Sequence, residues 1–135
     1  MIQYRPHGTC SINVEGNLMI IRAQGPWNQE YIDRLHKDLL LVSKSLDINN
    51  YGILLNLCGE ALAVESGFKK HLDFVKQAKT KAIAMNLSDC STREMTKTIF
   101  TKLYDQAKIN NASFTDESEA KAWLLEQLHN KTTTN

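Results

Sequence analysis

The chain has 135 residues and a net charge of +1, with 42% hydrophobic and 23% charged residues. A length of this kind is that of one ordinary domain, which can bury a core without disulfides or metal ions. The near-zero charge argues against nucleic acid or an anionic membrane as a partner, and no apolar run approaches the roughly 18 residues of a membrane-spanning helix.

The first predicted elements form a β-hairpin. Residues 10–15 alternate apolar and polar side chains, which is the period of a strand. The pair Gly16-Asn17 and the apolar run 18–23 follow, and a two-residue loop between such runs indicates a hairpin. Gly25-Pro26 then predicts a turn, or a helix that starts with proline in its first position.

A helix and a buried strand come next. Apolar residues recur at steps of three and four from Ile32 to Leu46, which indicates an amphipathic helix that Asn49-Asn50 ends. The runs Tyr51 to Leu57 and Ala82 to Leu87 are short and apolar, as is typical of parallel strands covered on both faces.

A second helix is predicted between these two strands. Its apolar stripe consists of Val64, Phe68, Leu72 and Val75. Because these residues recur at helical spacing, we expect Val64 and Phe68 to lie in the core.

Two further helices are predicted by their capping signals. At the start of each helix, two residues have the Ser/Asp-x-x-Glu spacing of a capping box. A capping box satisfies free N–H groups at a helix start. A short strand over Ala112 to Thr115 separates the two helices. The two pairs are Ser91 with Glu94 and Asp116 with Glu119.

The predicted order is therefore β-β-α-β-α-β-α-β-α. Strands that alternate with helices indicate an α/β fold, with a mostly parallel sheet of about five strands, an N-terminal antiparallel hairpin and four helices. We expect one domain over residues 1–129 and a disordered tail over residues 130–135.

The cysteines and histidines are isolated along the chain. Cys10, Cys58 and Cys90 are odd in number and form no CxxC motif, which favours free thiols in a reducing cytoplasm. The four histidines are equally scattered, so we expect no metal site and no cofactor. The N-terminal residues 1–8 lack the apolar segment of a signal peptide.

Enzyme motifs are missing from the sequence. It contains no GxGxxG, GxxxxGK[ST], GxSxG or HExxH. Ser66 has no base that the sequence reveals, and neither Cys58 nor Cys90 has a histidine nearby. We therefore expect no catalytic residues and no enzymatic activity.

The order of the elements and the C-terminal segment FTDESEAKAWLLEQL resemble a known family. The segment is similar to that of small bacterial SpoIIAA-like proteins, which end in a strand, acidic residues and Ala-x-x-Trp-Leu, here Ala120 to Leu124. The whole chain resembles the SpoIIAA-like fold of the STAS domains, which include the anti-sigma-factor antagonists. The resemblance implies a regulatory or protein-interaction module.

The phosphorylation motif of those antagonists is altered in this chain. Their Asp-Ser-Ser/Thr-Gly motif falls on Val64 to Gly67, so its aspartate becomes Val64 and its phosphoacceptor becomes Glu65. The second hydroxyl residue falls on Ser66. The comparison implies that the serine switch is absent, and Glu65 supplies a fixed negative charge in its place. Both residues also suit a first helical turn, where a carboxylate meets the helix dipole and a hydroxyl caps an N–H.

A candidate binding site lies at the carboxyl edge of the predicted sheet, where ligands bind in open α/β sheets and where three loops, residues 25–28, 58–66 and 88–93, should meet. Arg93 is informative because a cation is disfavoured in a first helical turn. Its partner is Glu65, Glu60, Asp89 or a bound anion, and a local pairing with Asp89 in solvent is the simpler alternative. The candidate residues are Trp27, Asn28, Glu60, Glu65, Ser66, Asp89 and Arg93.

Two functions from different classes fit these observations. The first is a non-enzymatic regulatory module that binds an unknown protein partner. The alternative is a carrier or sensor of a small apolar or anionic, lipid-like ligand, because apolar residues surround polar groups at the carboxyl edge and the CRAL-TRIO lipid-binding scaffold is similar. The apolar rim consists of Trp27, Leu62, Val64 and Phe68, which ordinary core packing also explains. A homodimer is left open, since pairing would bury exposed apolar residues.

Overall fold

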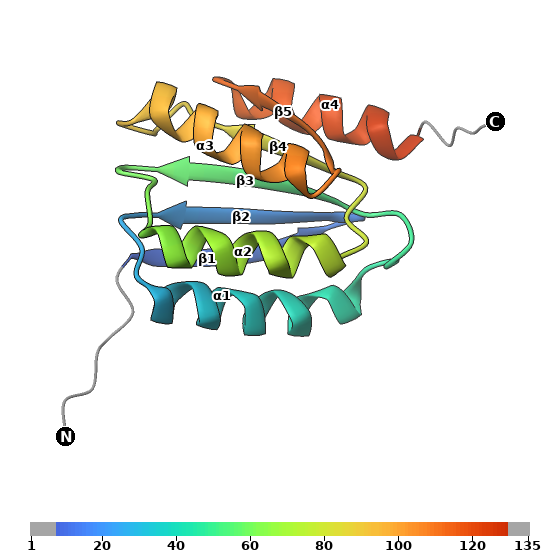
Figure 1. Ribbon diagram of the computed structural model, residues 1–135. Helices are drawn as coiled ribbons and strands as arrows, with labels where there is room; N and C mark the ends of the chain where they lie inside the picture. The colour runs from blue at the N-terminus through green and yellow to red at the C-terminus, as the bar shows by residue number, and fades with distance from the viewer. Residues whose placement is uncertain (1–7, 130–135) are drawn as a thin grey trace.

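The structure is a computed structural model that describes residues 8–129. Its elements follow the predicted order (Figure 1). The strands are β1 (Thr9–Glu15), β2 (Leu18–Gln24), β3 (Gly52–Cys58), β4 (Ala82–Asn86) and β5 (Asn110–Phe114). The helices are α1 (Gln29–Val42), α2 (Glu65–Gln77), α3 (Arg93–Gln106) and α4 (Glu117–His129), with a short 3₁₀ helix η1 (Ser43–Ser45). The predicted disordered tail 130–135 and most of the N-terminal segment 1–8 lie outside the described residues.

The sheet has the five-stranded order β1-β2-β3-β4-β5. β1 pairs with β2 in antiparallel orientation, and β2 to β5 are parallel to their neighbours. The hairpin turns at Gly16, whose φ of +60° is a left-handed conformation that glycine adopts without strain. The predicted α/β class, with its starting hairpin and mostly parallel sheet, is confirmed.

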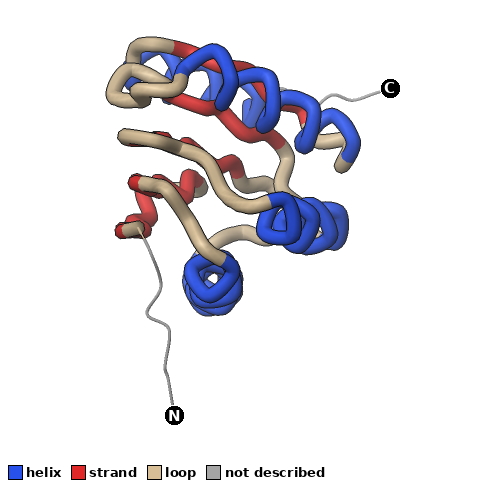
Figure 2. The backbone as a smooth tube through the Cα atoms, turned by 60° about the vertical axis from the view of Figure 1, so that its left-hand side comes forward, coloured by secondary structure: helices blue, strands red, loops and turns tan. Residues whose placement is uncertain are grey.

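The helices are divided unequally between the two faces of the sheet. Each crossover from β2 to β5 advances one strand in the same direction, and right-handed crossovers of that kind place their helices on the same face. α1, α2 and α3 accordingly lie over one face, and α4 returns to the other (Figure 1). In Figure 2, α1 and α2 are seen nearly end-on, side by side on one side of the sheet.

The central strand β3 contributes to both core layers. All seven of its residues are buried, as predicted from its apolar run. Ile53, Leu55 and Leu57 face α1 to α3, whereas Leu54 packs on the other side with Leu124 of α4. Successive side chains of a strand point to opposite faces, so one strand contacts both helix layers.

Two predicted element boundaries are wrong. α1 ends at Val42 rather than at Leu46, because Ser43 starts the 3₁₀ helix and its hydroxyl donates to the carbonyl of Leu40 at 2.7 Å. Leu46 then has an extended backbone with φ of −114°. The last strand starts at Asn110 and ends at Phe114, not over residues 112–115.

The two predicted capping boxes have different outcomes. Asp116 caps α4, because its Oδ1 accepts from the N–H of Ser118 at 2.8 Å and of Glu119 at 3.2 Å. Ser91 does not cap α3, which begins at Arg93 after Thr92. The backbone N–H of Ser91 donates instead to the carbonyl of Gly59 at 2.8 Å, which holds Ser91 in the loop between β4 and α3.

Candidate functional site

The three loops predicted to meet at the carboxyl edge are joined by backbone hydrogen bonds. The N–H of Trp27 donates to the carbonyl of Leu62 at 2.9 Å. Between the second and third loops, the N–H of Gly59 donates to the carbonyl of Asp89 at 3.0 Å. The predicted convergence of these loops follows from the parallel order of β2, β3 and β4.

Trp27 and Asn28 have structural positions in the first loop. Gly25-Pro26 forms a turn, not a helix start, and a Cβ at Gly25 would collide with the carbonyl of Glu60. Asn28 is the N-cap of α1, and its Oδ1 accepts from the N–H of Tyr31 at 2.9 Å. The side chain of Trp27 is only 5% exposed, so this residue belongs to the core and not to an open rim.

The segment aligned with the antagonists' phosphorylation motif is exposed. Val64 is 55% exposed, so the prediction that it lies in the core is wrong. The reason is that Val64 is the N-cap of α2, with an extended backbone outside the helical period. Glu65 and Ser66 occupy the first turn and face solvent, as does Glu60 in the preceding loop.

The two charged residues of the third loop do not pair with each other. Nη2 of Arg93 donates to the backbone carbonyl of Ser88 at 2.7 Å. The carboxylate of Asp89 lies 3.7 Å from Nη1 of Arg22. Arg93 is thus bound to its own loop, and Asp89 faces β2.

A polar cluster that the sequence reasoning missed lies on the α4 side of the same edge. Asn86 donates to Oδ1 of Asn56 at 2.8 Å, and Asn56 donates to Glu117 at 3.2 Å. Arg22 lies 3.8 Å from Glu117. The signal was present as an Asn-Leu pair at the end of both apolar runs, LLNL and AMNL, since polar residues in such strands require buried partners.

An apolar cavity of about 260 Å³ lies between the sheet and the helices α1 and α2. Its walls are the inward residues of β2 and β3, the inner sides of α1 and α2, and two residues of α3. Among the sequence-predicted candidates within residues 8–129, Trp27 alone lines it. The rim residue Phe68 lines it too, whereas Leu62 and Val64 do not.

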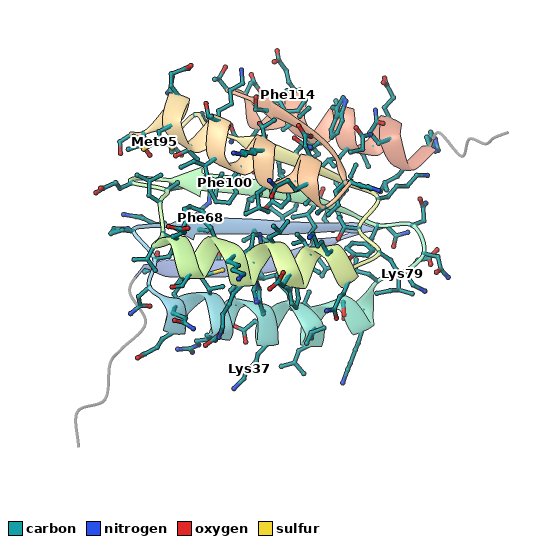
Figure 3. All side chains as sticks on the ribbon, in the orientation of Figure 1. Lys37, Phe68, Lys79, Met95, Phe100 and Phe114 are labelled. Carbon is teal, nitrogen blue, oxygen red and sulfur yellow. The ribbon has the colours of Figure 1, made fainter. Side chains whose placement is uncertain are left out.

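Aromatic rings form much of the cavity wall. Phe68 of α2 and Phe100 of α3 meet edge to face with ring centroids 5.5 Å apart, and Figure 3 shows the two residues on their neighbouring helices. Trp27 meets Phe100 edge to face at 6.2 Å and stacks on Tyr31 at 5.7 Å. The aromatic lining residues are Trp27, Tyr31, Tyr51, Phe68, Phe74, Phe100 and Tyr104.

The cavity opens at the amino edge of the sheet, opposite the predicted site. Its exposed lining residues are Leu40 on α1, Ile48 before β3, and Gln77 and Lys79 at the end of α2. Figure 3 shows Lys79 at the end of α2 away from Phe68. The interior therefore runs from Trp27 at the carboxyl edge to an opening near Lys79.

A chain of polar side chains crosses the cavity wall from α1 to α3. Nε2 of His36 lies 3.0 Å from Nδ1 of His71, and Nε2 of His71 lies 3.0 Å from the hydroxyl of Tyr104. Burial lowers the pKa of His71 to about 3 and that of His36 to about 4, because charged imidazole loses its hydration there. Burial also raises the pKa of Tyr104. All three side chains are consequently neutral at pH 7.

This chain was also missed at the sequence level. His36 lies four residues after Ile32, and His71 lies three after Phe68, so both histidines fall on the apolar stripes of their helices. A histidine on an apolar stripe requires a buried partner, which gave a usable signal. The partner itself comes from another helix, and spacing along one helix does not reveal it.

Residues 8–129 contain no cluster of three His, Cys, Asp or Glu side chains that could hold a metal ion. Within the same residues, no helix is long and apolar enough to cross a membrane.

Comparison with known proteins supports the fold. No protein-family model matches the chain, and no curated protein matches its sequence. The chain is similar to the crystal structure of an uncharacterized protein of the DUF3478 family from Shewanella loihica, which has a SpoIIAA-like fold. The TM-score is 0.65, with 13% sequence identity, over 92% of this chain and 98% of that chain. The expected SpoIIAA-like fold is thereby confirmed.

Proposed function

We propose that this protein is a non-enzymatic carrier or sensor that binds a small apolar ligand between the sheet and the helices α1 and α2. The observation that carries this proposal is the cavity of about 260 Å³. Natural ligand sites are concave, mostly apolar and furnished with a few polar groups. Here the polar groups include His71 and Tyr104 in the wall and Ser43 and Thr80 near the opening.

Energetics support occupation of the cavity. Side chains around an empty space lose dispersion contacts, and an apolar ligand restores these contacts. Transfer of the ligand's apolar surface out of water is also favourable. A ligand that binds only the folded state also stabilises it by mass action. The opening at the amino edge, beside Leu40 and Ile48, provides a route of entry that needs no change in the sheet.

The polar lining supports binding rather than catalysis. A general acid or base works best with a pKa near the operating pH. The pKa of His71 is lowered to about 3 by burial, and that of Tyr104 is raised. Each of the two side chains is hydrogen-bonded to the other at 3.0 Å.

Native mass spectrometry of freshly purified protein tests the proposal. We expect a small-molecule adduct that disappears on denaturation, or uptake of an apolar fluorescent dye by protein stripped of ligand. The variant Leu55→Phe, which places extra volume in the cavity, should reduce both signals. A clean apo mass together with no dye binding would contradict the proposal.

The second candidate is a regulatory module that binds a protein partner at the carboxyl edge. Val64 is 55% exposed at the start of α2, next to the fixed charge of Glu65, and Met95 is 57% exposed near the start of α3. Exposed apolar residues near charged ones are typical of interaction sites. The likeness in fold to the antagonists favours this candidate. The cytoplasmic location and the lack of a nucleic-acid partner stay predictions.

Intact-mass measurement on protein from its native cells tests the second candidate. We expect no phosphate on Ser66 in stressed or unstressed cells, because Glu65 occupies the phosphoacceptor position. If the edge docks a partner, Glu65→Ser should weaken binding, whereas Ser66→Ala should leave it intact. A stoichiometric phosphate mapped to Ser66 would instead restore a switch of the antagonist type.

A further inference from the structure

We propose that the ligand of the cavity is a neutral aromatic compound of one or two rings. The inference rests on the proposed function and specifies the class of ligand. The volume of the cavity, the geometry of its aromatic wall and the charges around it support this class of ligand.

The volume limits the ligand to a small molecule. A dry cavity of about 150 Å³ accommodates benzene, which has six non-hydrogen atoms. The cavity of about 260 Å³ therefore accommodates roughly ten such atoms by proportion. A bicyclic aromatic compound is of this size, whereas a membrane phospholipid is several times larger.

The wall presents rings in the arrangements that aromatic pairs prefer. Phe68 and Phe100 meet edge to face at 5.5 Å, and Trp27 meets Phe100 edge to face at 6.2 Å. Aromatic partners gain from edge-to-face and offset stacking beyond the area that they bury. An aromatic ligand in this cavity would form further ring–ring contacts of this kind. A saturated ring of equal size would gain only the burial of its surface.

The charges favour a neutral ligand. Lys79 is the one formally charged side chain that lines the cavity within residues 8–129, and it is exposed at the opening. Lys79 follows the C-terminal end of α2, where a cation compensates the helix dipole. An anion deeper in the cavity would face neutral His71 and Tyr104, and an unpaired buried charge is costly.

Matched compounds separate the parts of the proposal. Titrations followed by NMR chemical shifts would compare 1-indanone with its saturated analogue octahydroinden-1-one, which has the same ten non-hydrogen atoms. They would also compare 3-phenylpropanamide with 3-phenylpropanoate, which differ in charge. We expect 1-indanone to bind about tenfold more tightly than its saturated analogue, and the amide about tenfold more tightly than the carboxylate. The chemical-shift changes should lie around Phe68 and not around the indole of Trp123.

Two variants tie the preference to the wall. Phe68→Leu should reduce the preference for 1-indanone over its saturated analogue to about threefold or less. Phe114→Leu changes a ring that packs on the α4 side of the sheet and should leave the preference unchanged. If Phe68→Leu fails to fold, Phe74→Leu serves the same comparison, since Phe74 also lines the cavity.

The outcomes distinguish this inference from the proposed function. Equal binding of the two ketones would overturn the aromatic preference and leave an apolar binding site. Binding of the carboxylate as tight as that of the amide would overturn the proposal that the ligand is neutral. Loss of that binding in Lys79→Gln, but not in the solvent-facing Lys37→Gln, would show that Lys79 holds the carboxylate. No binding of any of the four compounds or of an apolar dye would overturn both proposals.

Discussion

His36 on α1 and His71 on α2 contact each other directly, with Nε2 of His36 3.0 Å from Nδ1 of His71 and the rings stacked at 5.2 Å. The second nitrogen of His71 reaches the hydroxyl of Tyr104 on α3. Three helices that cover one face of the sheet are thus linked by one chain of neutral side chains. The contact between the two imidazoles needs at least one of them to stay uncharged, because two protonated rings would place N–H against N–H.

Acid should therefore destabilise the protein. The folded-state pKa of His71 is about 3 and that of His36 about 4, below the value of about 6.5 for an unfolded chain. The unfolded state binds more protons between these values, so this stability is fully present above pH 6.5 and is lost progressively as the pH falls through about 4 and 3. From pH 7 to pH 5, His71 alone should account for about 2 kcal/mol of unfolding free energy.

Urea unfolding at a series of pH values measures this dependence. His71→Gln should make the profile less steep between pH 7 and pH 5, because the contribution of His71 is lost and that of His36 remains. His129→Gln changes an exposed residue at the end of α4 and should leave the profile as it is. An unaltered slope in His71→Gln would show that His71 is not the source.

The cavity predicts unequal costs for the same substitution at two adjacent residues of β3. Leu54 is 0% exposed and packed against α4, so Leu54→Phe should cost about 1–3 kcal/mol through overpacking. Leu55 lines the cavity, and Leu55→Phe should cost less than about 0.5 kcal/mol because the added atoms enter empty space. Urea unfolding of both variants checks the difference, and equal costs would argue against free volume beside Leu55.

The two buried asparagines should be energetically coupled. Asn86→Ala leaves Oδ1 of Asn56 without its donor and should cost about 1–3 kcal/mol. Replacing Asn56 and Asn86 together by alanine should cost less than the sum of the two single alanine changes, because the hydrogen bond between them is then lost only once and neither asparagine leaves the other unpaired. A double-mutant cycle measures the coupling, with the exposed Asn13→Ala as a control that stays within about 0.5 kcal/mol. Strict additivity would argue against the contact.

The two predicted capping residues should respond differently to alanine. Asp116→Ala removes the acceptor for two N–H groups of α4 and should cost about 1 kcal/mol. Ser91→Ala should change stability by less than about 0.5 kcal/mol, since its ordered contact is a backbone hydrogen bond that alanine retains. Thermal or urea unfolding compares the pair directly, and a large cost for Ser91→Ala would place that residue in a cap.

The start of α2 offers a stabilising change. Val64 is the N-cap and provides no side-chain hydrogen bond. Val64→Asp should stabilise the fold by about 0.5–2 kcal/mol, because the new carboxylate accepts from an N–H of the first turn and meets the helix dipole. Val64→Ala lacks the acceptor and serves as the control. Equal unfolding free energies of the two variants would show that the N–H groups are already well solvated.

Much of the fold follows from local pattern. The strand β3 was predicted because burial on both faces leaves a continuous apolar run, and α1 because burial on one side of a helix leaves apolar residues at steps of three and four. Helix ends were less certain, since a cap depends on contacts made after folding. Asp116 met the free N–H groups of its helix, whereas Ser91 was held by Gly59 from another loop.

The candidate sites depended on tertiary contacts. The pairing of Asp89 with Arg22, and not with Arg93, results from the place of β2 beside β3 in the sheet. Asn56 and Asn86 meet because β3 and β4 pair in a register that puts the two residues opposite each other. The cavity is least visible in the sequence, because its volume is set by how far α1 and α2 stand from the sheet. Periodicity records which side of a helix is covered, but the distance between two packed layers follows only from all the side chains that meet there.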